Sequence, residues 1–187
     1  VINSKSEEVY VKDLNGDGLI NDDDRTILGN PYPEFIWSVT NEFVIGRFDI
    51  SIMMQGSQGA ETRNIADIEG YSLTLGARST TSEAPRSEFL QRRVLTSDII
   101  QDAAFVALRN LNIGYKLPNS ILERFKLQSA RVYVSGSNLL FFDADDFTGW
   151  NPESVRQDTN FTAISYGYNR GGAPIVRKVV LGVNVNF

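Results

Sequence analysis

The chain has 187 residues and carries 18 Lys or Arg against 23 Asp or Glu, which gives a formal net charge of −5. It contains no Cys and no His, so disulfide frameworks, thiol nucleophiles and sites built on imidazole or thiolate are excluded. The acidic balance argues against nucleic acid as a partner, because a phosphate backbone is bound by basic surfaces. The longest apolar run, Ala103 to Leu108, is too short for a transmembrane helix, although the alternating strands of a membrane β-barrel would leave no longer run.

The first sharp motif in chain order is a calcium-type loop from Asp13 to Asp24. Oxygen-bearing side chains occupy loop positions 1, 3 and 5, a Gly stands at position 6, and a carboxylate closes the loop at position 12. Ca²⁺ is a hard cation that is held by clustered oxygen ligands, and the Gly permits the sharp turn that gathers them. We therefore predict a Ca²⁺ site, with Mg²⁺ as the alternative ion. The predicted ligands are Asp13, Asn15, Asp17, Leu19 through its backbone carbonyl, Asn21 and Asp24.

Two features of this loop qualify the prediction. Asp24 stands where an EF-hand has Glu, and no pattern for two flanking helices surrounds the motif. Asp, Asn and Gly also form turns without any metal, which is the alternative for this segment. The match at every ligand position favours the metal, with a structural role in pinning a long loop.

The next clear elements form a predicted β-hairpin. Residues 35–45 and 48–55 alternate apolar and polar side chains with period 2, and only Gly46 and Arg47 separate the two runs. Such alternation indicates strands with one apolar face, and so short a connection joins antiparallel neighbours.

Three further strands follow, separated by long polar stretches. Residues 104–116 are apolar mainly at odd positions, whereas residues 131–142 have their pattern interrupted by Gly136 and Asn138, which leaves the outer face of that strand unassigned. Residues 175–187 alternate most clearly and end on an aromatic residue. Strands of about ten residues, joined by alternating short and long connections, are typical of an outer-membrane barrel. A water-soluble β-sandwich also has alternating strands and stays open as the alternative.

Several short motifs lie in collinear order along nearly the whole chain. They are Asp13–Gly18, Asp24–Pro31, Pro33–Phe35, Phe48–Ser51 with Gln55–Gly56, Leu108–Pro118, Arg131–Leu139 and Arg177–Phe187. Together they resemble the SusC/RagA family of TonB-dependent outer-membrane transporters. The resemblance implies an all-β fold class, in which five antiparallel strands form the C-terminal part of a transmembrane β-barrel of about 22 strands.

The same resemblance implies how the chain is divided. The expected parts are an extracellular loop with the calcium-type motif (1–34), a hairpin (35–56), a second extracellular loop (57–103), a strand pair with a periplasmic turn (104–142), a third extracellular loop (143–174) and a closing strand (175–187). The plug and the TonB-contacting segment of the family are expected outside this chain.

The function implied by the resemblance is TonB-driven import of oligosaccharides or peptides across the outer membrane of a Gram-negative, Bacteroidetes-type cell. The implied partners are the remainder of the same barrel and its plug, a SusD-like surface lipoprotein, the TonB complex, outer-membrane lipid and the oligosaccharide or peptide itself. Enzymatic activity is not expected, because no carboxylate pair, such as Asp145 and Asp146, stands out from an ordinary charged loop.

The loops also contain candidate contacts for a substrate or a lid. These are Arg63, Arg78, Arg86, Trp150, Tyr166, Tyr168 and Arg170. Taken alone, each of them is better explained as a solvated loop residue. The alternative function for the whole chain is a secreted calcium-binding β-sandwich that serves as a carbohydrate-binding or adhesion module.

Overall fold

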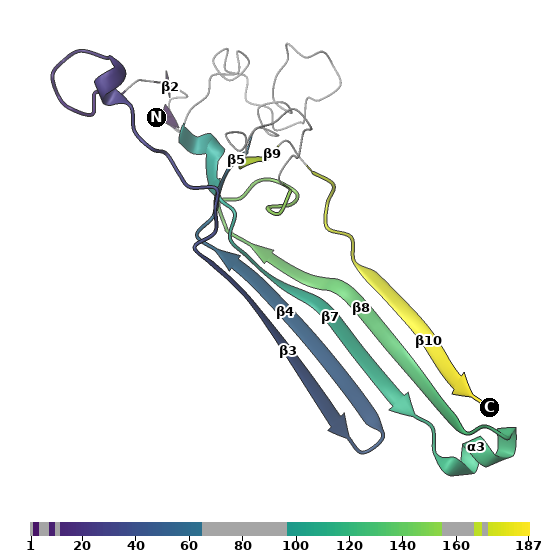
Figure 1. The fold of residues 1–187 in the computed structure, drawn as a ribbon. Helices are drawn as coiled ribbons and strands as arrows, with labels where there is room; N and C mark the ends of the chain where they lie inside the picture. Colours follow the sequence, from purple (N-terminus) through teal and green to yellow (C-terminus); the bar gives the residue numbers. More distant parts are fainter. Residues whose placement is uncertain (1, 4–7, 10–11, 65–96, 155–166, 170–171) are drawn as a thin grey trace, which may run out of the picture. The chain divides into compact units, whose positions relative to one another are not determined.

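The computed structural model describes residues 2–3, 8–9, 12–64, 97–154, 167–169 and 172–187 (Figure 1). The chain divides into two compact units. One, called here the strand unit, comprises residues 34–58, 104–143 and 175–187. The other, called the loop unit, comprises residues 1–33, 59–103 and 144–174. No helix among the described residues is both long enough and apolar enough to cross a membrane.

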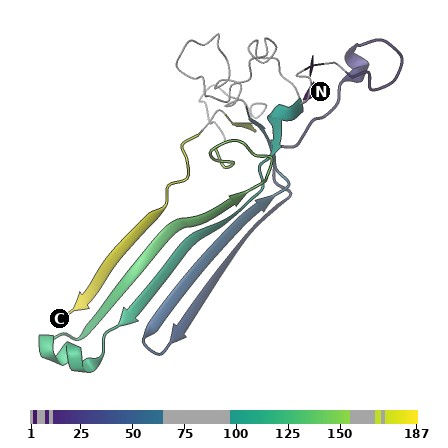
Figure 2. The same cartoon turned by 180° about the vertical axis from the view of Figure 1, so that it is seen from behind.

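The strand unit is a single antiparallel sheet of five long strands in the order β10-β8-β7-β4-β3, which both views show as one layer (Figures 1 and 2). The strands are β3 (Phe35–Ile45), β4 (Phe48–Gln58), β7 (Phe105–Lys116), β8 (Ser129–Asp143) and β10 (Lys178–Asn186). The sequence-based prediction of five antiparallel strands is confirmed, with boundaries that differ by up to three residues.

The two short connections of the sheet lie at the same end of it. Gly46, with φ 61°, and Arg47 form the tight turn between β3 and β4. The helix α3 (Asn119–Phe125) connects β7 to β8, and it ends where Lys126 adopts a left-handed conformation with φ 54°. The chain enters and leaves the sheet at the opposite end, next to residues 34, 58, 104, 143 and 175. The predicted alternation of short and long connections is therefore present.

The pairing register sorts the side chains into two faces, because successive residues of a strand point to opposite sides. The apolar face carries Phe35, Trp37, Val39, Phe43, Ile45, Phe48, Ile50, Ile52, Met54, Val106, Leu108, Leu111, Ile113, Tyr115, Val132, Val134, Leu140, Phe142, Val179, Leu181, Val183 and Val185. The opposite face is mainly polar and carries Thr40, Glu42, Asp49, Ser51, Gln55, Asn110, Asn112, Arg131, Tyr133, Ser135, Ser137, Lys178 and Asn184, together with the apolar Ile36, Val44, Met53 and Val180. The outer face of β8, which the sequence pattern left unassigned, is thus the face of Val132 and Val134.

A β-bulge changes the face pattern in the middle of β7. The register shifts between Leu108 and Asn110, so Arg109 is the extra residue of the bulge. In a straight strand Arg109 would share the apolar face with Leu111. The extra residue instead turns Arg109 to the polar face, and it places Phe105 there as well. The neighbouring strand β8 is irregular at the same place, where Asn138 has a left-handed backbone conformation with φ 51°.

The loop unit contains short strands that the sequence pattern did not predict. β5 (Glu61–Asn64) pairs antiparallel with β6 (Ile100–Asp102) and parallel with β9 (Tyr168–Asn169). Among the described residues, the other elements are β1 (Ile2–Asn3), β2 (Glu8–Val9) and the 3-10 turns η1 (Asp22–Asp24) and η3 (Ser97–Ile99). These strands have two to four residues, which is too few for a period-2 pattern to stand out.

Candidate functional site

The apolar face of the sheet is exposed on its edge strands β3 and β10 and half-buried over much of β4 and β7. Val179, Leu181 and Phe35 have exposed fractions of 67%, 74% and 59%. A soluble β-sandwich would cover such a face with a second sheet. The described residues of the strand unit form only one sheet, so the arrangement expected for the β-sandwich alternative is not found there.

Aromatic side chains of the apolar face gather at its two ends. Phe43, Phe48 and Tyr115 lie at the end with the short connections, where the rings of Phe48 and Tyr115 are 4.8 Å apart. Trp37 and Phe142 lie in one row at the other end. The rows between them are aliphatic apart from Asn41 and Gly136. An apolar band flanked by two aromatic girdles is the pattern of a strand wall that faces lipid.

Trp37 is held against the sheet by a neighbouring glycine. A Cβ atom built on Gly56 would lie 2.5 Å from the indole ring, so the ring lies directly across that backbone position. A side chain at position 56 would displace the indole, which explains why the sequence has Gly opposite Trp37.

The polar face carries a salt bridge that spans three strands. Arg131 of β8 donates from Nε to both carboxylate oxygens of Asp49 of β4, at 3.0 and 3.1 Å, and its Nη2 also contacts that carboxylate. The same guanidinium donates to the side-chain oxygen of Asn112 at 2.9 Å. It crosses β7 at Gly114, where a Cβ atom would collide with it. The pair is partly shielded from water, with exposed side-chain fractions of 24% and 28%.

Tyr133 extends this polar group to the edge strand β10. The Arg131 guanidinium lies 5.0 Å from the centre of the Tyr133 ring, a cation–π contact. The Tyr133 ring in turn covers Gly182, the residue opposite it on β10. The interactions therefore tie together β4, β7, β8 and β10 on one face of the sheet.

A second polar group surrounds Arg109 at the bulge. Its Nε donates to Gln55 at 2.8 Å and its Nη1 donates to Asn138 at 3.2 Å. The guanidinium lies 5.3 and 5.7 Å from the ring centres of Phe105 and Phe141, which stack on each other at 5.1 Å. The bulge is what makes this arrangement possible, because it directs Arg109 away from the apolar face.

The predicted calcium-type loop is closed by its own carboxylates. Asp13 accepts hydrogen bonds from the backbone N–H groups of Gly16, at 2.6 Å, and Gly18, at 2.8 Å. Asp24 accepts from Leu14 at 2.7 Å and from Asn21 at 3.0 Å, so the last loop position is bonded to the second. Gly16 and Gly18 have φ of 77° and 81°, values that favour Gly.

The other predicted ligands make local turns. The Asn15 amide oxygen accepts from Asp17 N–H at 3.0 Å, and Asp17 accepts from the N–H of Leu19 at 2.7 Å. Asn21 caps η1 by accepting from the N–H of Asp23 at 2.6 Å. Within the described ranges, no three acidic side chains converge as a group that would hold a metal. The donor set consists of oxygen atoms and suits a hard cation in kind, so metal binding by this loop stays a prediction.

The backbone of this loop shifts the titration of Asp24. Hydrogen bonds from the N–H groups of Asn21 and Leu14 stabilise the carboxylate and hold the pKa of Asp24 below its ordinary value of 3.8. The loop is therefore closed by an ionised Asp24 at neutral pH.

Two of the predicted substrate-contact residues are brought together in the loop unit. Arg63 of β5 donates from Nη1 to the hydroxyl of Tyr168 of β9, and its guanidinium lies 4.8 Å from the centre of that ring. Trp150 lies on the surface, with 72% of its area exposed. Arg78, Arg86, Tyr166 and Arg170 lie outside the described residues.

Buried amides beside Arg63 hold the loop unit together. The side-chain amide of Asn64, which is 1% exposed, donates to Gln101 at 2.9 Å and to Thr148 at 3.1 Å. Asn169 is fully buried and donates to the backbone oxygen of Asn151 at 2.8 Å. These contacts join segments that are far apart in the sequence.

Sequence reasoning missed the polar groups around Arg131 and Arg109. The sequence did contain a signal for the group around Arg131. Arg131 and Asp49 lie on the polar faces of predicted strands, and Gly114 lies on the strand between them. Arg109 gave no such signal, because period 2 placed it on the apolar face and only the bulge reverses that.

Comparison with known proteins bears on the chain as a whole. No family model matches it. It is 35% identical to TonB-dependent receptor P3 of Formosa agariphila over 94% of its own length and 18% of that receptor. It is 30% identical to TonB-dependent receptor P26 of the same organism, again over 94% of its length and 19% of the relative. The chain thus spans about a fifth of the length of the curated relatives it matches.

Solved structures show the same fold. The whole chain superposes on 20% of a chain in the closed-closed state of the RagAB peptide importer, with a TM-score of 0.66 and 17% identity. The open-open state of the same importer gives a TM-score of 0.64 at the same coverage. The predicted fold class, five antiparallel strands of a transporter barrel of this type, is confirmed by this likeness together with the sheet.

The relatives and the fold together define the class of protein. The chain belongs to the TonB-dependent receptors, as the resemblance in its motifs indicated. Its relatives are receptors and not enzymes, which confirms the expectation that it has no enzymatic role.

Proposed function

We propose that this chain is a wall segment of a TonB-dependent importer in the outer membrane of a Bacteroidetes-type cell. Its five long strands would be the last of a barrel of about 22 strands. The apolar face would contact lipid and the polar face would line the lumen. The observation that carries this proposal is the two-faced sheet, whose exposed apolar band is flanked by aromatic rows at both ends.

Physical chemistry favours closure of this sheet into a barrel. In lipid, an open sheet edge would leave backbone N–H and C=O groups without hydrogen-bond partners, each at a cost of several kcal/mol. The sheet has two such edges, β3 and β10, which would pair with further strands of the receptor. The short connections at Gly46–Arg47 and α3 would then lie in the periplasm, with the loop unit's segments outside the cell, because short turns are periplasmic in such barrels.

The cargo and the partners form the next part of the proposal. The structural neighbour is a peptide importer, RagAB, so a peptide is the first candidate cargo and an oligosaccharide is the second. A SusD-like surface lipoprotein would cover the extracellular side, and the TonB complex would supply energy through segments outside this chain. Arg63 and Tyr168 are the described residues of the loop unit that we assign to contacts with the cargo or the lid.

We also propose that the calcium-type loop binds Ca²⁺ through Asp13, Asn15, Asp17, Leu19, Asn21 and Asp24. An oxygen-only donor set and the closure of the loop by Asp24 support this proposal. The metal would have a structural role, in which it fixes the shape of an extracellular loop.

The transport proposal is tested with two neighbouring residues on opposite faces of β8. Cells that lack the receptor are complemented with Ser135→Cys or Val134→Cys, and the chain itself contributes no other thiol. A bulky, water-soluble thiol reagent is added, and uptake of fluorescent peptides and of fluorescent oligosaccharides is measured. We expect the reagent to block uptake only in Ser135→Cys cells. Equal uptake by cells with and without the receptor would contradict the proposed function.

A further inference from the structure

Three basic residues stand side by side at the end of the sheet that carries the short connections. Arg131 is paired with Lys116 on one side and with Asn184 on the other in the strand register. Lys116 in turn donates its backbone N–H to the carbonyl oxygen of Arg47, at 2.9 Å. Arg47, Lys116 and Arg131, called here the basic row, therefore occupy neighbouring positions across the β3–β4 turn, β7 and β8.

Adjacent like charges of this kind are unfavourable unless something offsets them, because cations directly opposite one another on neighbouring strands repel. Asp49 is the carboxylate that the described residues place at this row, and its hydrogen bonds go to Arg131. Asp49 also lies near enough to Lys116 to feel its charge, so this one carboxylate is shared by two cations of the row. Arg47 adds a third positive charge to the row.

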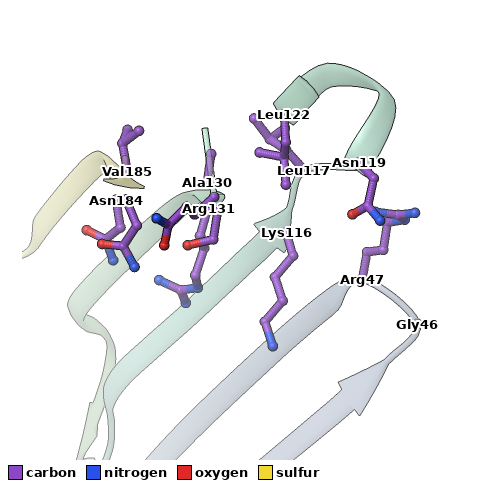
Figure 3. A pocket seen from close by; sticks show the side chains of 13 residues that line it. Gly46, Arg47, Lys116, Leu117, Asn119, Leu122, Ala130, Arg131, Asn184 and Val185 are labelled. Atoms are coloured by element: carbon purple, nitrogen blue, oxygen red, sulfur yellow. The ribbon is translucent and has the colours of Figure 1, made fainter. Parts of the chain in front are cut away.

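The basic row lines a hollow of about 530 Å³ (Figure 3). Three residues with amide side chains also line it, namely Asn119 on α3, Gln128 before β8 and Asn184 on β10. No Asp or Glu is among the described residues that line it. The hollow therefore offers N–H donors and positive charge, together with space for a small group.

We infer that this hollow is an anion-binding site for an oxyanion, a carboxylate or a phosphate, with positive charge from Arg47, which lies beside Asn119, and from Lys116. Charge-assisted hydrogen bonds from Lys and Arg to such groups are the strong ones, and the amides supply further donors. The anion has two sources: a free anion from solution, or a carboxylate that belongs to another part of the receptor. The inference uses only contacts within the strand unit and does not depend on the proposed cargo.

The test relies on the sign of a stability change. The receptor that carries this chain is purified as wild type, Lys116→Met and Arg47→Met. Lys178→Met serves as the matched control, because Lys178 lies on the same polar face but opposite Ser137, away from the basic row. The melting temperature is measured against inorganic phosphate at constant ionic strength, with chloride as the comparison salt.

If the site binds a free anion, phosphate should raise the melting temperature of the wild type and of Lys178→Met. Lys116→Met and Arg47→Met then bind phosphate about tenfold more weakly or worse, as expected for loss of one charge-assisted hydrogen bond. If the site instead binds a carboxylate of the receptor, Lys116→Met and Arg47→Met should both melt at a lower temperature than the wild type at every phosphate concentration. Lys116→Arg should then stay close to the wild type. The inference is overturned if Lys116→Met and Arg47→Met have an unchanged or higher melting temperature in all conditions. Such a result would mean that each substitution relieves repulsion between the cations without removing a bound anion. None of these results depends on where Val134 and Ser135 point, so the inference and the proposed function fail separately.

Discussion

The strand unit and the loop unit are built in opposite ways. In the strand unit, long strands pair with their sequence neighbours or near neighbours, and side chains sort by face. In the loop unit, strands of two to four residues are held by buried amides such as Asn64 and Asn169. The strand unit has eight Lys or Arg and five Asp or Glu, whereas the loop unit has ten and 18. A regular sheet and an acidic, irregular loop unit have different determinants of stability, and substitutions can separate them.

The largest effect is expected on the apolar face of the strand unit. Val179 lies in the central row of that face, opposite Gly136, and Val180 points to the other face. We expect Val179→Arg to destabilise the receptor by about 2–4 kcal/mol, the cost of Arg near the middle of a membrane strand wall. Val180→Arg is the matched control and should cost far less. Urea unfolding of the receptor in lipid vesicles measures both, and equal losses would show that the two faces do not differ in environment.

The next largest effect concerns the bridge between Arg131 and Asp49. Removing either partner leaves a partly shielded charge without its partner, and we expect a loss of about 1–2 kcal/mol after allowance for solvent screening. A double-mutant cycle with Arg131→Met and Asp49→Asn isolates the interaction. The double variant should be more stable than the sum of the two single losses predicts. Strict additivity in urea unfolding would mean that the two groups do not interact.

A smaller and local effect is expected in the loop unit. Tyr168→Phe removes the hydroxyl that accepts from Arg63 but keeps the ring beneath the guanidinium. We expect a loss of about 0.5–1.5 kcal/mol, the usual contribution of one hydrogen bond. Hydrogen exchange should speed up around β5 and β9 and stay unchanged in β7 and β8. Faster exchange throughout the long strands would mean that the two units do not open independently.

The smallest effect is expected at Asp24, which lies in an exposed loop. If Ca²⁺ binds there, adding Ca²⁺ should slow proteolysis between residues 12 and 25 in the wild type, and Asp24→Asn should abolish that protection. Asp22→Asn is the control, because Asp22 pairs with Arg25 and its side chain is 85% exposed. Protection that persists in Asp24→Asn, or that is absent from the wild type, would remove Asp24 from the ligand set.

The same loop should respond to acid with a defined sign. The pKa of Asp24 is lowered by backbone hydrogen bonds in the folded loop, so its contribution to stability is complete above the ordinary value of 3.8. That contribution is lost as the pH falls through the lower folded value. In metal-free buffer, cleavage of the loop by an acid-active protease should therefore increase only below pH 3.8, and Asp24→Asn should show no such step.

Much of the strand unit could be predicted because its determinants are local. Period 2 located all five long strands, and the short turn at Gly46 and Arg47 set the pairing of the first two. The motifs then pointed to the correct family. The turn residues of the calcium-type loop were also local, and Asp13 and Asp24 do close that loop.

The parts that could not be predicted depend on contacts between distant residues. Arg109 looks lipid-facing until the bulge turns it toward Gln55, and a bulge leaves no period of its own in the sequence. β5 and β9 form because Thr62 and Gly167 meet across 105 positions, with the hydroxyl of Thr62 donating to that carbonyl at 2.9 Å. No local pattern carries that information.

The central claim is that one face of this sheet contacts lipid and the other contacts water. The most direct test places spin labels one at a time along β7, from residue 105 to residue 116. For each label, accessibility to oxygen, which dissolves in lipid, is compared with accessibility to a water-soluble relaxation agent. We predict lipid access at Val106 and Leu108, then a reversal of phase at Arg109, and lipid access again at Leu111, Ile113 and Tyr115. Uniform access to water along β7, or alternation that passes through Arg109 without a change of phase, would contradict the account.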